Sequence, residues 1–138
     1  MSDDAAKVAE LRRALRVLIV EDSFMTARAL TRMLQDFGAE VVGPVPTVVK
    51  AMELLDSGAC DAALLDINLG GETVEPVADR LERTGLPFMF VSGYTSPKSL
   101  LDNPRFKGKR LVSKPVEPSI LRQAFAEVFG PPPRPEAA

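Results

Sequence analysis

The sequence reads RVLIVEDSFMTARALTRMLQDFG over residues 16–38, and this stretch decides the fold. Its first five residues are mostly β-favouring and almost continuously apolar, which is typical of a strand covered on both faces. The acidic pair Glu21-Asp22 ends that strand. Apolar residues then recur on one helical face, at Leu30, Met33, Leu34 and Phe37, and Gly38 stands where a helix C-terminal cap belongs. The stretch therefore predicts a buried strand followed by a helix of about three turns.

The same alternation of strand and helix continues toward the C-terminus. Further strands are expected at residues 41–42, 61–67, 88–91 and 110–113, and further helices at the apolar periodicities after Thr47, Val74 and Leu121. Residues 95–109 carry a weak pattern because Pro97 and Pro104 bracket only a short apolar stretch, so the fourth helix should be short or irregular. Alternating strands and helices imply right-handed crossovers and a parallel sheet with helices on both faces. We therefore predict a doubly wound α/β fold with a five-stranded parallel sheet.

Length and composition indicate one domain. A chain of 138 residues with 46% hydrophobic content can bury one core and is too short for two domains of ordinary size. We place this domain at residues 16–130. Residues 1–15 form an N-terminal arm with apolar residues at helical spacing. Residues 131–138 are Pro-rich and are expected to form an extended, flexible tail.

The composition argues against several classes of protein. Acidic and basic residues are interspersed and the net charge is −2, so we expect no nucleic-acid partner. No apolar stretch approaches the ~20 residues of a membrane span and no signal peptide is recognisable, so we expect a cytoplasmic protein with no membrane contact. Because the chain has no histidine, it cannot be a histidine kinase or use a histidine-activated nucleophile. The lone Cys60 is expected to be a buried, inert thiol.

Residues that carry chemistry stand at four predicted strand ends. They are Glu21 and Asp22 after the first strand, Asp66 at the end of the third, Ser92 after the fourth and Lys114 after the fifth. Ligands of open α/β sheets bind outside the carboxyl ends of the strands, so the topology gathers these side chains at one edge. Each residue, taken alone, could also have a purely structural role. The acidic pair could interact with the dipole at a helix N-terminus, and Asp66 could stabilise a turn. Together they are the residue types that one reaction needs.

That reaction is phosphoryl transfer to a carboxylate. Three gathered carboxylates would repel one another and be partly protonated without a cation among them. A hard cation such as Mg²⁺ takes oxygen ligands, keeps several waters and binds a phosphate oxygen. Asp66 would then be the nucleophile, while Lys114 supplies a positive charge and Ser92 a hydroxyl donor for the phosphoryl oxygens.

At this point a family resemblance can be stated. The ordered set Glu21-Asp22, Asp66, Ser92 and Lys114-Pro115 resembles the receiver domain of bacterial two-component response regulators, over roughly residues 16–130. The resemblance implies a flavodoxin-like fold of five strand–helix units with Asp66 as the phosphorylation site. It further implies that Ser92 and Lys114 hold the phosphoryl oxygens and that the Lys114-Pro115 peptide bond is cis.

The resemblance also implies a metal ligand set. Mg²⁺ would be bound by the carboxylates of Asp22 and Asp66 and by the backbone carbonyl of Asn68. Glu21 would act mostly through a metal-bound water. Mg²⁺ is therefore the expected cofactor.

A narrower likeness lies in residues 87–94, PFMFVSGY. They are similar to the motif of the FAT GUY group of receivers, which are mostly single-domain proteins of alphaproteobacteria. That group usually has Ala and Thr where this chain has Val91 and Ser92, so the hydroxyl is retained. Receivers commonly carry an aromatic residue three positions before the Lys, where this chain has Leu111. Tyr94 is consequently the best candidate for a side chain whose position reports phosphorylation.

These observations predict a stand-alone response regulator. A histidine kinase or His-phosphotransfer protein would donate a phosphoryl group to Asp66, and the phosphorylated domain would then bind or release a downstream protein. Such a chain is not an enzyme for another substrate, because it catalyses only its own aspartyl phosphorylation and dephosphorylation. One alternative is a phosphate sink without a dedicated output. Another is a receiver-like binding module that is no longer phosphorylated.

A third alternative is a phosphohydrolase of the haloacid-dehalogenase type, which also uses a nucleophilic Asp with Mg²⁺. Those enzymes place the nucleophile after the first strand, with a second Asp two residues later. Here the candidate nucleophile Asp66 follows the third strand and Asn68 comes two residues later, so the sequence disfavours this class.

Overall fold

The computed structural model of the chain describes residues 14–93 and 102–130. Its elements are β1 (Arg16–Val20), α2 (Phe24–Asp36), β2 (Glu40–Val45), α3 (Val48–Asp56), β3 (Ala62–Asp66), β4 (Asn68–Leu69), β5 (Glu72–Thr73), α4 (Glu75–Thr84), β6 (Phe88–Ser92), the 3-10 turn η1 (Pro104–Phe106), β7 (Leu111–Ser113) and α6 (Pro118–Phe129). Most of the predicted arm, the Pro-rich tail and Tyr94 lie outside the described residues.

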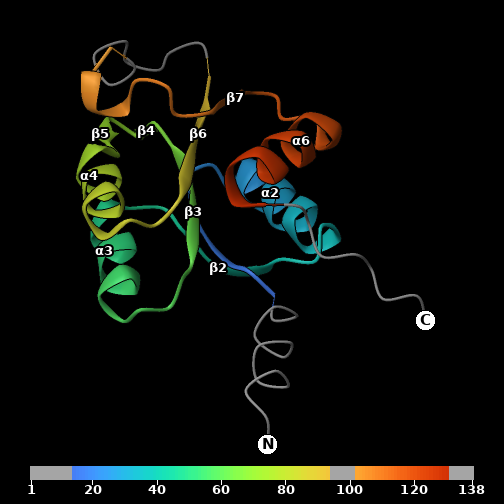
Figure 1. The fold of residues 1–138 in the computed structure, drawn as a ribbon, viewed down its shortest axis with the longest axis horizontal. Helices are drawn as coiled ribbons and strands as arrows, with labels where there is room; N and C mark the ends of the chain where they lie inside the picture. Colours follow the sequence, from blue (N-terminus) through green and yellow to red (C-terminus); the bar gives the residue numbers. More distant parts are fainter. Residues whose placement is uncertain (1–13, 94–101, 131–138) are drawn as a thin grey trace, which may run out of the picture.

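Five of the strands form one parallel sheet in the order β2-β1-β3-β6-β7 (Figure 1). The chain runs from β1 outward to β2 and then returns to the other side of β1 with β3. This strand order is that of flavodoxin-like folds, and the reversal beside β1 is where such folds bind ligands. The predicted doubly wound fold is therefore confirmed.

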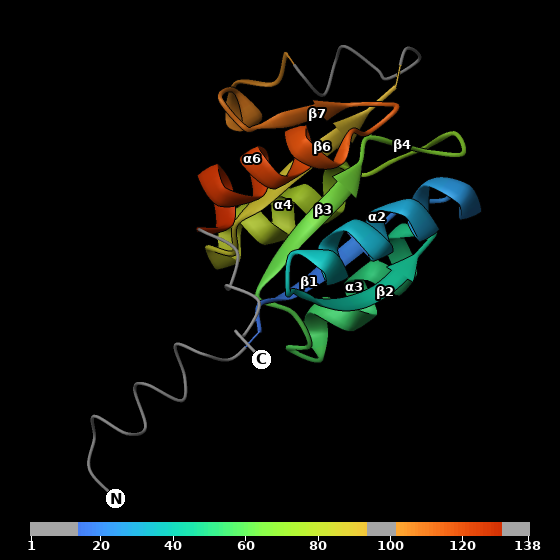
Figure 2. The same cartoon turned by 90° about the vertical axis from the view of Figure 1, so that its right-hand side faces the viewer.

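Helices cover both faces of the sheet (Figures 1 and 2). Helices α2 and α6 lie on one face and bury Leu30, Leu34, Leu121, Ala124 and Phe125. Helices α3 and α4 lie on the other face and bury Ala51, Val77, Ala78 and Leu81. β3 and β6 are buried along their whole length because the layers cover them on both sides. None of the described helices is long and apolar enough to cross a membrane.

Side-chain caps explain where two of the helices begin. The hydroxyl of Ser23 accepts a hydrogen bond from the backbone N–H of Thr26 at 3.4 Å, so α2 starts directly after the acidic pair. Thr47 caps α3 in the same way by accepting from Lys50 N at 3.3 Å, so α3 begins directly after Thr47, where the periodicity predicted a helix. Cys60 is buried as expected, and this burial raises the pKa of its thiol.

The structure corrects the predicted strands at several points. β2 extends over six residues rather than two, because it pairs with β1 along most of its length. β3 begins at Ala62 rather than Asp61, whose carboxylate is instead engaged by the guanidinium of Arg16 at 2.9 Å. The hairpin of β4 and β5 was not predicted, because its two-residue strands are too short to show a period.

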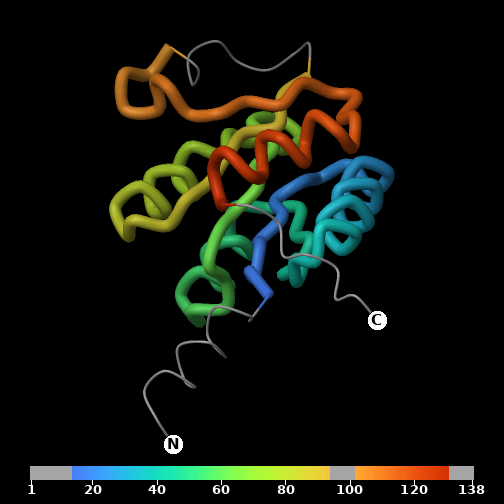
Figure 3. Tube along the Cα trace, turned by 45° about the vertical axis from the view of Figure 1, so that its right-hand side comes forward, coloured from blue at the N-terminus to red at the C-terminus, as the bar shows by residue number. Residues whose placement is uncertain are grey.

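Of the predicted irregular stretch the structure describes residues 102–109, in which η1 is the one helical element, and the rest of the stretch lies outside the described residues. The orange segment of residues 102–110 in Figure 3 runs beside α4. Its Phe106 is buried edge-on against Phe88 and Phe90, with ring centroids 6.3 and 5.9 Å apart. Arg105 forms an ion pair with Asp79 of α4.

We expect the ring of Phe106, rather than the surface ion pair, to fix this segment. Phe106→Ala should lower the free energy of unfolding by about 3 kcal/mol, because it leaves a cavity between two other rings. Arg105→Ala should cost only about 1 kcal/mol, because the guanidinium of this ion pair is half exposed to water. Equilibrium unfolding in urea measures both values. Equal losses in the two variants would contradict this assignment.

Candidate functional site

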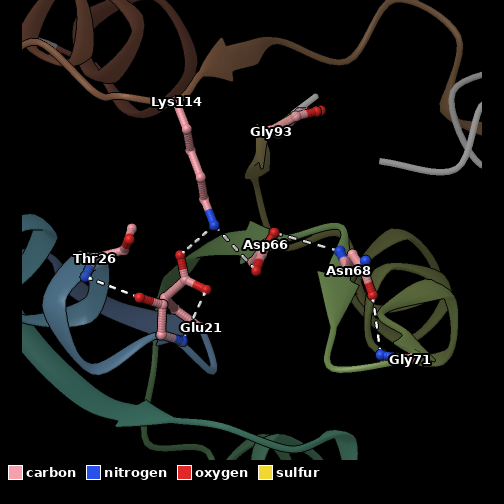
Figure 4. Close-up of polar contacts among 9 residues, drawn as sticks. Glu21, Thr26, Asp66, Asn68, Gly71, Gly93 and Lys114 are labelled. Carbon is pink, nitrogen blue, oxygen red and sulfur yellow. Dashed lines mark hydrogen bonds and ion pairs between the residues drawn. The ribbon is translucent and has the colours of Figure 1, made fainter. Parts of the chain in front are cut away.

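The carboxyl ends of the strands bring the predicted residues together at one edge of the sheet (Figure 4). Parallel pairing places Asp66 of β3 beside Val91 of β6. The backbone N–H of Lys114 donates to the carbonyl of Ser92 at 2.8 Å, so the residue after β7 lies beside the end of β6. These residues therefore lie close together at one edge of the sheet, as the topology predicted.

Asp66 lies at the centre of this edge with an exposed fraction of only 4%. Its Oδ1 accepts a hydrogen bond from the backbone N–H of Asn68 at 3.3 Å. Its Oδ2 lies 3.2 Å from Nζ of Lys114. These two contacts fix the orientation of the carboxylate, as a nucleophile requires.

Glu21 is the second buried carboxylate and is only 3% exposed. Its Oε1 lies 2.7 Å from Nζ of Lys114, so one ammonium group bridges Glu21 and Asp66. Burial and the neighbouring Asp66 carboxyl raise the pKa of Glu21, and Lys114 offsets only part of this rise. Burial also lowers the pKa of Lys114, but the two carboxylates outweigh it and the net shift is upward.

Asp22 completes an acidic cluster. Glu21, Asp22 and Asp66 each present a carboxylate oxygen, and these oxygens lie within 4.8 Å of one another. Asp22 is exposed, whereas the other two are buried, so the cluster opens to solvent on the Asp22 side. Hard oxygen donors gathered in this way suit a divalent cation such as Mg²⁺.

The remaining predicted residues lie around this centre. Ser92 is buried, and its hydroxyl donates to the carbonyl of Gly93 at 3.2 Å. Asn68 accepts at its side-chain oxygen from the backbone N–H of Gly71 at 3.1 Å, so its side chain is engaged within the hairpin. The Lys114-Pro115 peptide bond is cis, as the resemblance implied. The roles of these residues in phosphoryl transfer stay predictions.

An apolar groove adjoins the cluster and was not predicted. It has a volume of about 220 Å³ and is lined by Met25, Thr26, Ala29, Leu30, Met33, Lys114, Pro115 and Val116. Phe24 and Met25 at the start of α2 are 73% and 76% exposed. The signal in the sequence was two apolar residues directly after the N-cap, outside the buried face of the helix.

The chain matches the response regulator receiver domain over residues 17–126. It belongs to this family. The receiver's strand order and the position of Asp66 after the third main strand also differ from the haloacid-dehalogenase arrangement, in which the nucleophile follows the first strand.

Several known proteins are similar to this receiver. A curated relative is the DNA-binding transcriptional activator DevR/DosR of Mycobacterium tuberculosis, 29% identical over 117 residues, which are 83% of this chain and 54% of the relative. This chain thus spans about half of that protein. Among solved structures, SdrG from Sphingomonas melonis Fr1 is 34% identical with a TM-score of 0.72, over 82% of this chain and 94% of that one. The REC domain of PhyR from Erythrobacter litoralis is 27% identical with a TM-score of 0.74, over 91% and 97%.

The bridging ammonium of the receiver leads to a test. Lys114→Met should lower the free energy of unfolding at neutral pH by about 3 kcal/mol, because two buried carboxylates lose their counter-charge. The loss should shrink in acid. A raised pKa means that folded Glu21 binds a proton more tightly than unfolded Glu21, so its protonation favours the folded state as the pH falls.

Urea unfolding of the parent and of Lys114→Met at neutral and acid pH measures this difference. Lys50→Met, at an exposed position of α3, is the control and should behave as the parent at both pH values. A loss in Lys114→Met that does not change with pH would contradict the proposed bridge.

Proposed function

We propose that this receiver takes a phosphoryl group on Asp66 and acts as a stand-alone response regulator. The observation that carries the proposal is the ammonium of Lys114 lying 3.2 Å from Asp66 and 2.7 Å from Glu21 at the ligand-binding edge of the sheet. Membership of the receiver family supports aspartyl phosphorylation. The likeness of residues 87–94 to the motif of a mostly single-domain group supports the stand-alone role.

The reaction is a displacement at phosphorus. A carboxylate oxygen of Asp66 attacks, a P–O bond forms, and the P–N bond of a donor phosphohistidine breaks with its electron pair on the imidazole nitrogen. Lys114 would hold one phosphoryl oxygen, and Ser92 would donate its hydroxyl to another after leaving the carbonyl of Gly93. The chain then acts on no substrate beyond its own Asp66.

The acidic cluster fits Mg²⁺ as the cofactor of this step. Its donors are carboxylate oxygens within 4.8 Å of one another, and its solvent-open side leaves room for metal-bound water and a phosphoryl oxygen. Asp22 and Asp66 would hold the ion with the carbonyl of Asn68, and Glu21 would act through water. When bound, Mg²⁺ neutralises charge on the phosphoryl oxygens.

The donor would be a histidine kinase or a His-phosphotransfer protein. Lys114 lines both the acidic site and the apolar groove. A donor protein that covers the exposed Phe24 and Met25 would therefore bring its phosphohistidine next to Asp66. Exposed apolar side chains beside a groove are typical of protein contact surfaces.

The output would leave through the segment after β6. Phosphorylation draws Ser92 toward Asp66, and the chain from Gly93 leads to the segment of residues 102–110 on α4. The surface ion pairs of this segment are individually weak, so a small bias can shift it and change the binding of a downstream protein. In the alternative role of phosphate sink, phosphorylation would occur without any such shift.

Phosphorylation by a small phosphodonor tests the function. The parent should incorporate phosphoryl only when Mg²⁺ is present, and Asp66→Asn should incorporate none, because an amide is a far poorer nucleophile in a nearly equal volume. In Asp22→Ala, added Mg²⁺ should neither increase phosphoryl incorporation nor raise the melting temperature, as it does in the parent.

The matched control is Asp36→Asn at the exposed end of α2, which should be labelled like the parent. Full labelling of Asp66→Asn would overturn the choice of acceptor. A parent that takes up no phosphoryl would favour the alternative of a binding module that is no longer phosphorylated.

A second test concerns the donor surface. Met25→Glu should slow phosphotransfer from a histidine kinase or phosphotransfer protein roughly 10-fold, because it places a charge on an apolar contact. It should leave labelling by a small phosphodonor unchanged. Val49→Glu is the control, since Val49 is 65% exposed on α3, across the sheet. Equal slowing by both substitutions would show that the groove has no special part in donor binding.

A further inference from the structure

The hairpin after Asp66 has a turn of two glycines. Asn68 pairs with Thr73 and Leu69 with Glu72, which leaves Gly70 and Gly71 as the two turn residues. Their φ angles are +62° and +91°, a region that L side chains rarely adopt. A two-residue turn with both φ positive matches the right-handed twist of a hairpin and favours Gly-Gly. Backbone conformation alone therefore accounts for both glycines.

The hairpin is attached to the site at Asn68 and to the core at Leu69. The backbone N–H of Asn68 donates to Asp66, and its side-chain oxygen accepts from Gly71. Leu69 is only 4% exposed and belongs to the core cluster on the α3 and α4 side of the sheet. The turn is therefore held at a fixed place relative to the acceptor carboxylate (Figure 4).

The two glycines differ in what surrounds them. A Cβ added at Gly70 would lie 3.2 Å from Oδ2 of Asp22, which is closer than side chains ordinarily pack. A Cβ added at Gly71 would have no atom within 4 Å. Gly70 thus lies against the exposed carboxylate of the acidic cluster, although Asp22 is far from it in the sequence.

We propose that Gly70 is a positioning residue for Asp22. The backbone of the hairpin turn lies against the Asp22 carboxylate and keeps it close to Asp66, and a Cβ at residue 70 would push against that carboxylate. This inference rests on the proposed binding of Mg²⁺ to the cluster. A methyl group at residue 70 displaces either Asp22 or the turn that contains the carbonyl of Asn68, and both are parts of the proposed ligand set.

Such a displacement should affect the affinities for Mg²⁺ and Ca²⁺ to different extents. Mg²⁺ requires near-ideal octahedral geometry with short bonds, whereas Ca²⁺ accepts longer bonds and variable coordination. A shift of a few tenths of an ångström in one carboxylate therefore weakens Mg²⁺ binding more than Ca²⁺ binding. Simple loss of hairpin stability has no reason to distinguish the two ions.

The experiment compares Gly70→Ala with Gly71→Ala in the full chain. Calorimetric titration with Mg²⁺ and, separately, with Ca²⁺ gives the affinities, and thermal unfolding without metal shows that each variant is folded. Gly70→Ala should bind Mg²⁺ about 10-fold more weakly, with a smaller loss for Ca²⁺, as found when supports of metal ligands are changed. Gly71→Ala should keep the parent affinities, although its φ angle is the less favourable for alanine.

Equal Mg²⁺ affinity in Gly70→Ala and the parent, or equal losses in the two alanine variants, would overturn the inference and leave the metal site standing. A parent that binds no Mg²⁺ would overturn the metal role and this inference with it.

A second measurement, of melting temperature, tests the inference if Gly70→Ala folds poorly. In a chain that also carries Asp22→Ala, the loss of melting temperature caused by Gly70→Ala should shrink, because the close approach to Oδ2 is gone. The loss caused by Gly71→Ala should not change. If Gly70→Ala lowers the melting temperature by the same amount with and without Asp22→Ala, the contact does not contribute to stability and the inference is overturned.

Discussion

Two carboxylates and one ammonium group, those of Glu21, Asp66 and Lys114, lie together at the carboxyl ends of the strands of a parallel sheet. Burying either carboxylate alone would cost several kcal/mol, and their mutual repulsion adds to that cost. The position of Lys114 after β7 therefore decides whether β1 and β3 can end in acids side by side. The buried apolar residues of the sheet could tolerate many substitutions of similar volume. Loss of the cation from this triad would instead cost several kcal/mol.

The same triad sets the net charge of the site and therefore which ions it attracts. Its charges at neutral pH sum to one negative when both acids are ionised, and Asp22 adds another on the exposed side. A cation is attracted to this cluster, whereas an anionic phosphoryl group is repelled until a cation has entered. Burial, together with the neighbouring Asp66 carboxyl, also raises the pKa of Glu21. In the proposed function, this negative charge would favour metal binding before phosphoryl transfer.

Much of this was predictable because it follows from periodicity and topology. The apolar run 16–20 and the helical face through Leu34 were enough to predict the first unit, and parallel strands then require their carboxyl ends to meet. The bridge from Lys114 to Glu21 was not predictable, because it depends on side-chain torsions and on burial. The close approach of Gly70 to Asp22 was not predicted, because residues 68–73 have no alternating apolar pattern that would indicate a hairpin. The Gly-Gly pair was a hairpin signal that could have been used.

Cys60 is the one cysteine of the chain, and it lies buried between α3 and β3 with a raised thiol pKa. Reagents that attack thiolates reach it slowly while the domain stays folded. A cysteine placed on the surface would then be the single thiol open to a dye. A fluorophore on the hairpin or beside the groove could follow metal and partner binding without first removing the native thiol.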